Sequence, residues 1–246
     1  MDATTIALFV ASTFVGGIVT GLAGFAFGLV VSGVWLYIVT PVQFACLIVS
    51  FGIFVQGYGM WHLRRSFNWR HVVPLVIGNT LGVPLGVWLL HFLDPGTVRL
   101  GIGTVLILYS LNGLLRPHLT PIPASLPFEL AVGFVNGILG GMTGLAGVFV
   151  TIFCAMRGWS KDEQRSVYQP VILASFIATG ISLAATGAFD RAVGAFFLYG
   201  APALAIGMWI GLQLYGRLDD AGFRKVVLWL LLLSGVALVG PQLFAR

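Results

Sequence analysis

The sequence of 246 residues contains very little charge. Asp, Glu, Lys and Arg make up 9% of it and hydrophobic residues 58%, whereas about a quarter of the residues of a soluble domain are charged. The few charges fall in short clusters between apolar runs that are long enough to cross a ~30 Å hydrocarbon core. This shortage excludes a soluble globular domain and predicts an all-α integral membrane protein.

Carboxylates are especially scarce, and none lies in the middle of an apolar run. The eight acidic residues all fall at or near segment ends: Asp2, Asp94, Glu129, Asp162, Glu163, Asp190, Asp219 and Asp220. A cation carrier or a proton relay normally needs an acidic side chain at membrane depth. The distribution therefore argues against a cation as the transported substrate and favours an anion.

The sequence also lacks the patterns that metal centres and nucleophilic enzymes require. Cys46 and Cys154 lie in apolar runs without a CxxC pattern or a nearby histidine, and the four histidines lack metal-ligand spacing. We therefore expect no metal, no cofactor and no catalytic residue. The thirteen Lys and Arg are scattered over short loops, which excludes a nucleic-acid surface. The N-terminus has no basic n-region, so we interpret the first run as a mature span.

Ten apolar runs remain, five in each half of the chain. The first half covers residues 1–115, a Pro-rich linker covers 116–126, and the second half covers 127–246. The runs lie at about 4–20, 24–40, 42–61, 72–92, 98–115, 127–140, 144–156, 166–187, 192–215 and 223–243. Runs beside the two glycine-rich stretches are shorter than the ~20 residues of a straight span. We expect broken or re-entrant helices there.

The glycine-rich stretch occurs twice, 120 positions apart. This shift superposes Phe14 on Phe134, Val15 on Val135, Gly17 on Gly137, Ile18 on Ile138, Gly21 on Gly141, Gly24 on Gly144 and Ala26 on Ala146. Further along, a shift of 125 superposes Ser50 and Phe51 on Ser175 and Phe176, and Gly82 and Gly86 on Gly207 and Gly211. The two halves are therefore expected to be structural repeats.

The basic residues predict the orientation of these repeats. When the runs alternate across the membrane, ten of the thirteen Lys and Arg share one face, which is expected to be cytoplasmic. Both termini then lie outside the cell membrane. Because each half has an odd number of segments, the second half starts on the opposite side from the first. The sequence thus predicts two inverted five-segment repeats.

Inverted-repeat transporters bind substrate where discontinuous helices expose backbone groups. Glycine lets the backbone leave helical geometry, and a helix N-terminus attracts anions. Uncharged polar residues in the nearby apolar runs can add side-chain hydrogen bonds. We predict as substrate-binding residues Thr20, Gly21, Gly24, Asn136, Gly141, Thr143, Gly144 and Gln169. The alternative is that the glycines only allow close helix packing and that the polar side chains only join helices.

Three segments resemble the TauE/SafE sulfite-exporter family, also called TSUP. They are residues 17–24, GIVTGLAG, residues 137–144, GILGGMTG, and residues 157–170, RGWSKDEQRSVYQP. The resemblance extends over nearly the whole chain. It implies transport of sulfite or of a small sulfonate such as sulfoacetate, and no enzymatic activity.

The function predicted from these observations is secondary transport of a small sulfur-containing anion by alternating access, with the substrate bound between the two glycine-rich breaks. Two alternatives remain at this stage, a passive anion channel and an intramembrane sulfur-handling enzyme. The expected partners are the anionic substrate and the lipid bilayer. Proton or sodium coupling and a homo-oligomer both remain open.

Overall fold

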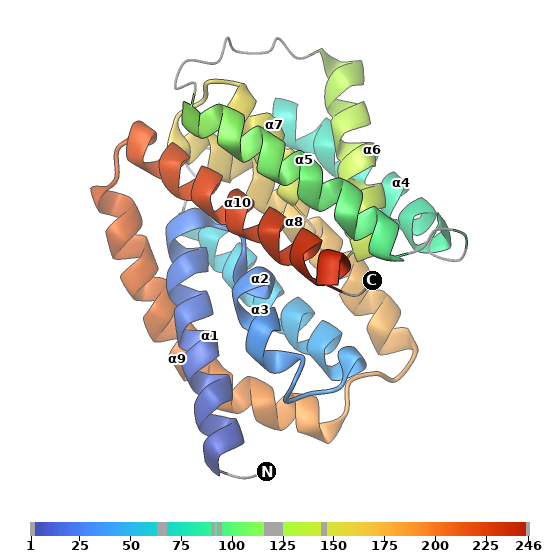
Figure 1. Cartoon of the computed structure of the whole chain (residues 1–246), viewed down its shortest axis with the longest axis vertical. Helices are drawn as coiled ribbons and strands as arrows, with labels where there is room; N and C mark the ends of the chain where they lie inside the picture. The colour runs from blue at the N-terminus through green and yellow to red at the C-terminus, as the bar shows by residue number, and fades with distance from the viewer. Residues whose placement is uncertain are drawn as a thin grey trace. The chain divides into compact units, whose positions relative to one another are not determined.

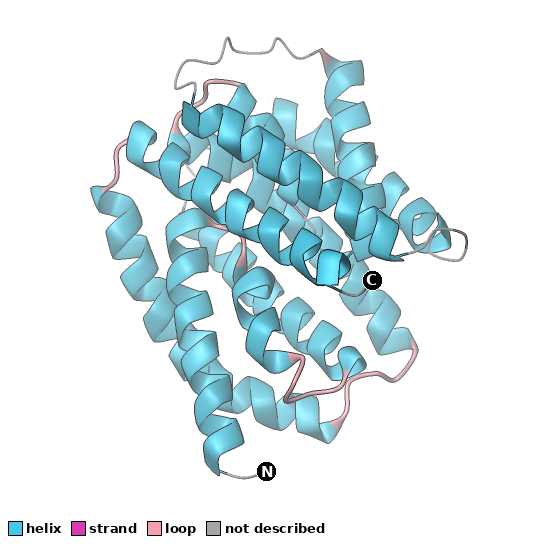
Figure 2. Cartoon of the chain, in the orientation of Figure 1, coloured by secondary structure: helices cyan, strands magenta, loops and turns pink. Residues whose placement is uncertain are grey.

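The computed structural model describes residues 3–62, 68–89, 92, 95–115, 125–143 and 147–244. Within these ranges the chain forms helices joined by short loops and contains no strand (Figure 2). The helices in chain order are α1 (Ala3–Ala23), α2 (Phe27–Trp35), α3 (Pro41–His62), α4 (Trp69–Leu89), α5 (Pro95–Leu115), α6 (Leu126–Thr143), α7 (Val148–Met156), α8 (Lys161–Ala185), α9 (Arg191–Arg217) and α10 (Asp220–Phe244) (Figure 1).

Six of these helices are long and apolar enough to cross a membrane: α1, α3, α4, α8, α9 and α10. Shorter apolar helical stretches cover Leu100–Leu115 and Leu126–Met142. In contrast, α2 and α7 have nine residues each. At a rise of 1.5 Å per residue each measures about 14 Å, less than half of the hydrocarbon core. The prediction of an all-helical, multi-pass membrane protein is confirmed.

The helix surfaces also match a lipid environment. Large apolar side chains such as Leu81, Ile181, Leu198, Trp209 and Leu233 are exposed on four of the long helices. Single exposed apolar residues are common in soluble proteins, but these lie on helices that are apolar around their whole circumference. Such helices bury one side against protein and present the other to lipid.

The chain divides into two compact units, which we describe separately. The first unit contains Met1–Arg65 and Ile172–Leu218, and the second contains Ser66–Val171 and Asp219–Arg246. Each unit therefore combines segments from early and late parts of the chain, and α8 contributes to both. These units are defined by packing, whereas the predicted halves at 1–115 and 127–246 are defined by repetition. The division into halves remains a prediction, and most of the linker lies outside the described residues.

In the first unit, α1 and α9 pack closely along their length because glycines face the neighbouring backbone (Figure 1). A Cβ atom added at Gly17 would lie 2.9 Å from the Leu204 carbonyl oxygen, and one added at Gly207 would collide with that of Phe14. Small residues at such contacts are the usual means of helix association in lipid.

An aromatic cluster fills the rest of this unit. The Trp35 ring of α2 stacks on Phe9 of α1 with ring centroids 4.5 Å apart and lies 5.6 Å from Phe51 of α3. Phe196 of α9 packs on Phe9 at 4.7 Å. The nine-residue α2 is therefore fixed by its apolar side chains, several of which are buried.

In the second unit, α4 pairs with α6, and α5 pairs with α10. The α4–α6 contact again depends on glycine, since a Cβ atom added at Gly82 or Gly86 would collide with the carbonyl oxygen of Phe134 or Ile138. In the first unit, Gly207 and Gly211 face Phe14 and Ile18 in the same way. The shifts of 125 and 120 positions found in the sequence relate these two sets of contacts residue by residue.

Candidate functional site

The first candidate site lies where α1 ends and α2 begins. Gly24 adopts a φ of 78° and Ala26 a φ of 72°, so the backbone leaves helical geometry between Ala23 and Phe27. A positive φ is unfavourable for alanine and marks local backbone strain. Ala26 is the N-cap of α2 and provides no side-chain hydrogen bond to the first turn. The N-terminal amides of α2 thus lack the side-chain acceptor that most helices have.

Two buried polar side chains flank this junction without a full set of partners. Thr20 is completely buried, and its Oγ1 has no hydrogen-bond partner among the described residues. Gln56 of α3 donates from Nε2 to the Gly24 carbonyl at 3.1 Å, whereas its Oε1 has no described partner. A buried polar atom without a partner costs about 1–3 kcal/mol. Such atoms are expected where a ligand completes the hydrogen bonding.

Gly21 has a packing role that is visible in the structure. A Cβ atom added there would lie 2.5 Å from the Met208 carbonyl oxygen, so α9 leaves no space for a side chain. Gly141 of α6 faces the Val83 carbonyl oxygen of α4 at the same distance. The alternative interpretation of these glycines, close helix packing, therefore accounts for both positions. Their contact with a substrate stays a prediction.

The second candidate site lies where α6 ends at Thr143 and α7 begins at Val148. Gly147 is the N-cap of α7 with a φ of 98°. The predicted residue Gly144 lies outside the described residues, as does the side chain of Thr143. The site can therefore be described only on its α4, α6 and α7 sides.

Asn136 uses its amide to hold three helices together in this second unit. Its Nδ2 donates to Asn79 Oδ1 of α4 at 2.8 Å, and its Oδ1 accepts from the Val150 N–H of α7 at 3.2 Å. Both asparagines are buried. Asn136 thus satisfies one N-terminal amide of α7, which the glycine N-cap cannot do. In this structure it positions α7, and its contact with a substrate stays a prediction.

Gln169 is the most conspicuous polar residue of the second unit. It is completely buried on α8, and neither atom of its amide has a hydrogen-bond partner in the described part of the chain. Pro170 follows it inside the helix and lacks an N–H, which leaves a carbonyl one turn earlier without its helical donor. Gln169 therefore combines an unpartnered amide with a locally weakened helix.

Arg165, one turn before Gln169, was not predicted as a site residue. Only 1% of Arg165 is exposed. Among the described residues, Glu129 is the one other charged residue that is buried. The sequence places Arg165 in a charged segment that suggests a solvated helix end. Its spacing of four residues from Gln169 is the signal that puts both on one helix face. Gln56 and Asn79 are also absent from the predicted set, although both are amides inside apolar runs.

The predicted residues therefore fall into two groups. Thr20, Gly21 and Gly24 belong to the first unit, and Asn136, Gly141, Thr143 and Gln169 to the second. No cluster of three or more His, Cys, Asp or Glu that could hold a metal ion occurs within the described ranges. Cys46 and Cys154 are free and buried, and the Cys46 thiol donates to the Ala188 carbonyl at 3.4 Å.

Comparison with known proteins gives one match. No curated protein and no solved structure matches the chain. The family described as Sulfite exporter TauE/SafE matches residues 8–238, which include both glycine-rich junctions and the segment from Arg157 to Pro170. Because this match covers nearly the whole chain, six of whose described helices are long and apolar enough to cross a membrane, the protein belongs to the TauE/SafE sulfite exporter family.

Proposed function

We propose that the protein is a secondary transporter of a small sulfur-containing anion, such as sulfite or the sulfonate sulfoacetate. Membership in the TauE/SafE family supports this class of substrate. The observation that carries the proposal is Thr20, a fully buried hydroxyl without a described partner beside the uncapped N-terminus of α2. A hydroxyl donor and a helix N-terminus without a side-chain cap both suit an oxyanion.

The charges in the structure support an anion rather than a cation. Thr20 and Gln56 at the α1–α2 junction and Gln169 on α8, whose buried polar atoms lack a described partner, are all neutral. Thr20 and Gln169 can donate to sulfonate or sulfite oxygens, and Gln56 Oε1 can accept from the protonated oxygen of hydrogen sulfite. Neutral donors bind an oxyanion without the repulsion that a carboxylate would cause.

Alternating access through inverted repeats is part of the same proposal. Its support is the recurrence of the glycine contacts, α1 with α9 and α6 with α4, at the two shifts found in the sequence. In this proposal each half supplies one interrupted helix, and each interruption presents donors to the substrate. We place the protein in the cell membrane with both termini outside, following the distribution of Lys and Arg.

The decisive experiment measures anion flux in proteoliposomes containing the purified protein. We expect saturable uptake of labelled sulfite or sulfoacetate above that of empty liposomes, with chloride as a poor competitor. Absence of flux for both anions under every imposed gradient would contradict the proposal. Flux that never runs uphill with a proton or sodium gradient would identify a passive channel instead of a carrier.

We also propose that the protein is not an enzyme. The family is a transporter family, and the two buried cysteines have no metal cluster near them within the described ranges. The double substitution Cys46→Ala with Cys154→Ala is therefore expected to retain flux. If the substitution abolished flux in protein that remained folded, a sulfur-transferring mechanism would regain support.

A further inference from the structure

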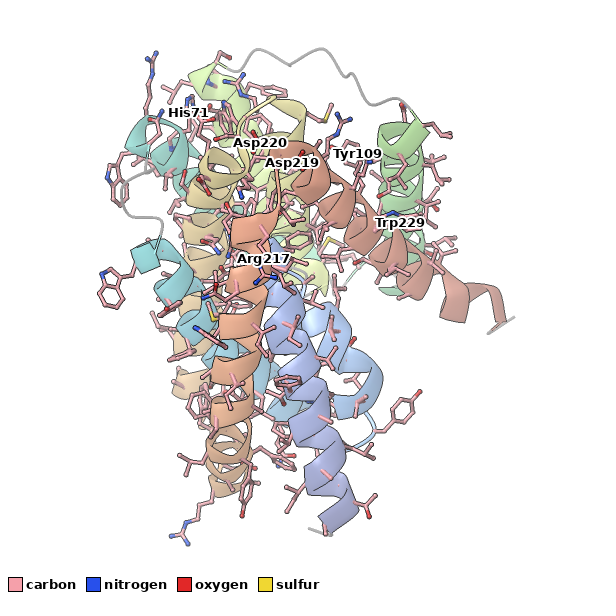
Figure 3. All side chains as sticks on the ribbon, turned by 90° about the vertical axis from the view of Figure 1, so that its left-hand side faces the viewer. His71, Tyr109, Arg217, Asp219, Asp220 and Trp229 are labelled. Carbon is pink, nitrogen blue, oxygen red and sulfur yellow. The ribbon has the colours of Figure 1, made fainter. Side chains whose placement is uncertain are left out.

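A buried carboxylate contacts a histidine between the first turns of α4 and α6. His71 Nδ1 lies 2.5 Å from Glu129 Oε1, and the two residues are 58 positions apart in the sequence. The Glu129 side chain is 4% exposed, whereas 21% of the His71 side chain remains exposed. Figure 3 shows His71 at the beginning of α4. Protons from water can therefore reach the imidazole, while the carboxylate is almost entirely removed from water.

The segment between α7 and α8 covers this pair with an aromatic ring. The Trp159 ring lies 5.0 Å from the His71 ring, and the Arg157 guanidinium lies 4.9 Å from the Trp159 ring centre. Other groups near the pair are Arg70, exposed beside His71, and the Cys154 thiol of α7, which lies within the electric field of Glu129. On α5, which also packs on α6, Tyr109 is the titratable group among the described side chains.

The same helix pair carries a second polar contact, Asn79 with Asn136, further along both helices. Glu129 and Asn136 are seven residues apart, or about 11 Å along α6. Asn136 binds the first turn of α7, and Phe153 near the other end of α7 packs on Trp159 at 6.1 Å. The short helix α7 is thus held at its start by Asn136 and near its end by the ring that covers His71.

We propose that His71 and Glu129 form a proton-binding site whose occupancy is linked to anion binding at the first turn of α7, beside Asn136. This inference rests on the proposed function and identifies the proton as the coupling ion. Without the proton, a neutral imidazole faces a carboxylate and the pair carries a net charge of −1. With the proton bound, an imidazolium faces the carboxylate and the net charge is zero. Imidazole is the side chain whose charge changes between pH 5 and 8.

The size of the linkage follows from the distance. For an anion bound beside Asn136, ~11 Å along α6 from Glu129, a unit negative charge on the pair weakens binding about tenfold at an effective dielectric constant of ~20. Protonation of the pair removes this charge and therefore strengthens anion binding by about the same factor. Linkage is reciprocal, so anion binding must raise the proton affinity about tenfold, or about one pH unit. The proton and the anion would then move in the same direction.

Trp159 provides a direct measurement of this proton, because a protonated imidazole quenches a neighbouring indole. The fluorescence difference between the wild-type protein and Trp159→Phe is recorded from pH 8.5 to about pH 5. We expect quenching as the pH falls, no such transition in His71→Gln, and a transition at lower pH in Glu129→Gln, where the imidazolium loses its carboxylate. Identical titrations of the wild type and His71→Gln would overturn the proposal. If His71→Gln does not fold, Glu129→Gln is used instead. A transition at the wild-type pH in that variant would overturn the proposal.

The linkage is tested by repeating the titration with saturating sulfoacetate, whose own ionisation barely changes in this range. We expect the midpoint to rise by about one pH unit in the wild type and by a similar amount, from a lower starting pH, in Glu129→Gln, because the proton adds the same charge in both. An unchanged midpoint in the wild type, with binding shown by thermal stabilisation, would overturn the linkage. Without any binding of sulfoacetate or sulfite the proposed function fails, and the fluorescence transition alone still reports the proton site.

Flux provides a second and independent readout. A pH gradient is expected to drive uphill sulfoacetate or sulfite movement by the wild type, whereas His71→Gln, which cannot take up the proton, retains only downhill movement. Downhill flux in the wild type that ignores the pH gradient would overturn proton coupling and leave the transporter function intact. The glutamine amide of His71→Gln can still donate to Glu129 but takes up no proton in this pH range, so loss of coupling with retained downhill flux excludes a merely structural role.

Discussion

At the residue scale, the threonines of α1 illustrate two different uses of a buried hydroxyl. Thr13 donates to the Phe9 carbonyl one turn earlier at 2.6 Å, as threonine commonly does inside a helix. Thr20 is equally buried but makes no such bond to the described residues. The helix therefore satisfies one hydroxyl locally and leaves the other beside the α1–α2 junction.

The substitution Thr20→Val separates stability from function. Valine has nearly the same shape without the unpartnered hydroxyl, so we expect an unchanged or higher Tm, because about 1–3 kcal/mol of unsatisfied burial is removed. Sulfite or sulfoacetate flux should fall about tenfold, which corresponds to the loss of one hydrogen bond of about 1.4 kcal/mol. Proteoliposome flux and thermal unfolding in detergent measure both effects.

Thr13→Val is the matched control on the same helix. It removes a hydroxyl that already has a partner, so it should lower Tm slightly and leave flux per folded molecule unchanged. Equal losses of flux in both variants would show that the Thr20 hydroxyl has no special role at the junction.

Asp190, the N-cap of α9, is the second residue whose role is clear in the structure. Its Oδ2 accepts from Gln43 Nε2 at 2.9 Å, and its Oδ1 accepts from the Val193 N–H at 2.7 Å. The Gln43 hydrogen bond, followed by the Val193 amide, lowers the pKa of this carboxyl below its ordinary value. Both bonds favour the ionised form.

This shift predicts the direction of a pH effect on stability. Because the folded-state pKa is lower than the unfolded one, Asp190 contributes its stabilisation above the ordinary pKa of about 3.9 and loses it as the pH falls through the folded value. Asp190→Asn keeps a capping oxygen but cannot ionise. The Tm difference between the wild type and Asp190→Asn should therefore be constant from pH 8 to 5 and shrink below about pH 4. A difference that grew towards low pH would contradict this assignment.

At the element scale, helix pairing depends on glycines that face a neighbouring backbone. The pairs α1–α9 and α4–α6 contain these glycines at corresponding positions, and a Cβ atom at any of them would meet backbone atoms, which cannot rotate away. Helices in lipid lack a hydrophobic force that brings them together, so close approach of their backbones is the main source of affinity.

Replacing one of these glycines by alanine should push the two helices of its pair apart. We expect Gly207→Ala on α9 and Gly82→Ala on α4 each to destabilise the protein by about 1–3 kcal/mol or to prevent its folding. Gly194→Ala is the control on α9, because nothing lies within 4 Å of its added Cβ, and alanine there should be neutral or slightly stabilising. Thermal unfolding of the three variants measures these changes in stability. Equal stability of Gly207→Ala and Gly194→Ala would contradict the packing role of Gly207.

At the scale of the whole molecule, the basic residues predict the orientation in the membrane. Arg217 is exposed at the cytoplasmic end of α9 in this prediction, and Thr186 is exposed in the loop that precedes the opposite end. Helix α9 has 27 residues, or about 40 Å at 1.5 Å per residue, so its two ends can lie on opposite membrane faces.

A pair of cysteine variants tests this orientation. In intact cells, a membrane-impermeant maleimide should label Thr186→Cys, whereas Arg217→Cys should react only after the membrane is opened. The native Cys46 and Cys154 are both buried, so the wild-type protein is the unlabelled control. The reverse labelling pattern would place both termini in the cytoplasm and overturn the predicted topology.

The sequence alone determined that the apolar segments are helices and that the protein lies in a membrane, and it predicted where two of the helices are interrupted. In lipid every backbone N–H and C=O must be satisfied within the segment, so an apolar run has to be a helix and a glycine cluster is where it can stop. The junctions at Gly24 and Gly147 lie in or directly beside the two glycine-rich stretches for this reason. The family was also recognisable from these stretches and the segment from Arg157 to Pro170.

Only the tertiary structure decided which helices are neighbours and which polar groups meet. Apolar helices present similar surfaces in every direction, so the hydropathy pattern cannot show that α1 packs on α9 or α4 on α6. The contact of His71 with Glu129, the burial of Arg165 and the capping of α7 by Asn136 all join or enclose residues through such helix contacts. Each depends on distances between positions far apart in the chain, which local sequence chemistry does not encode.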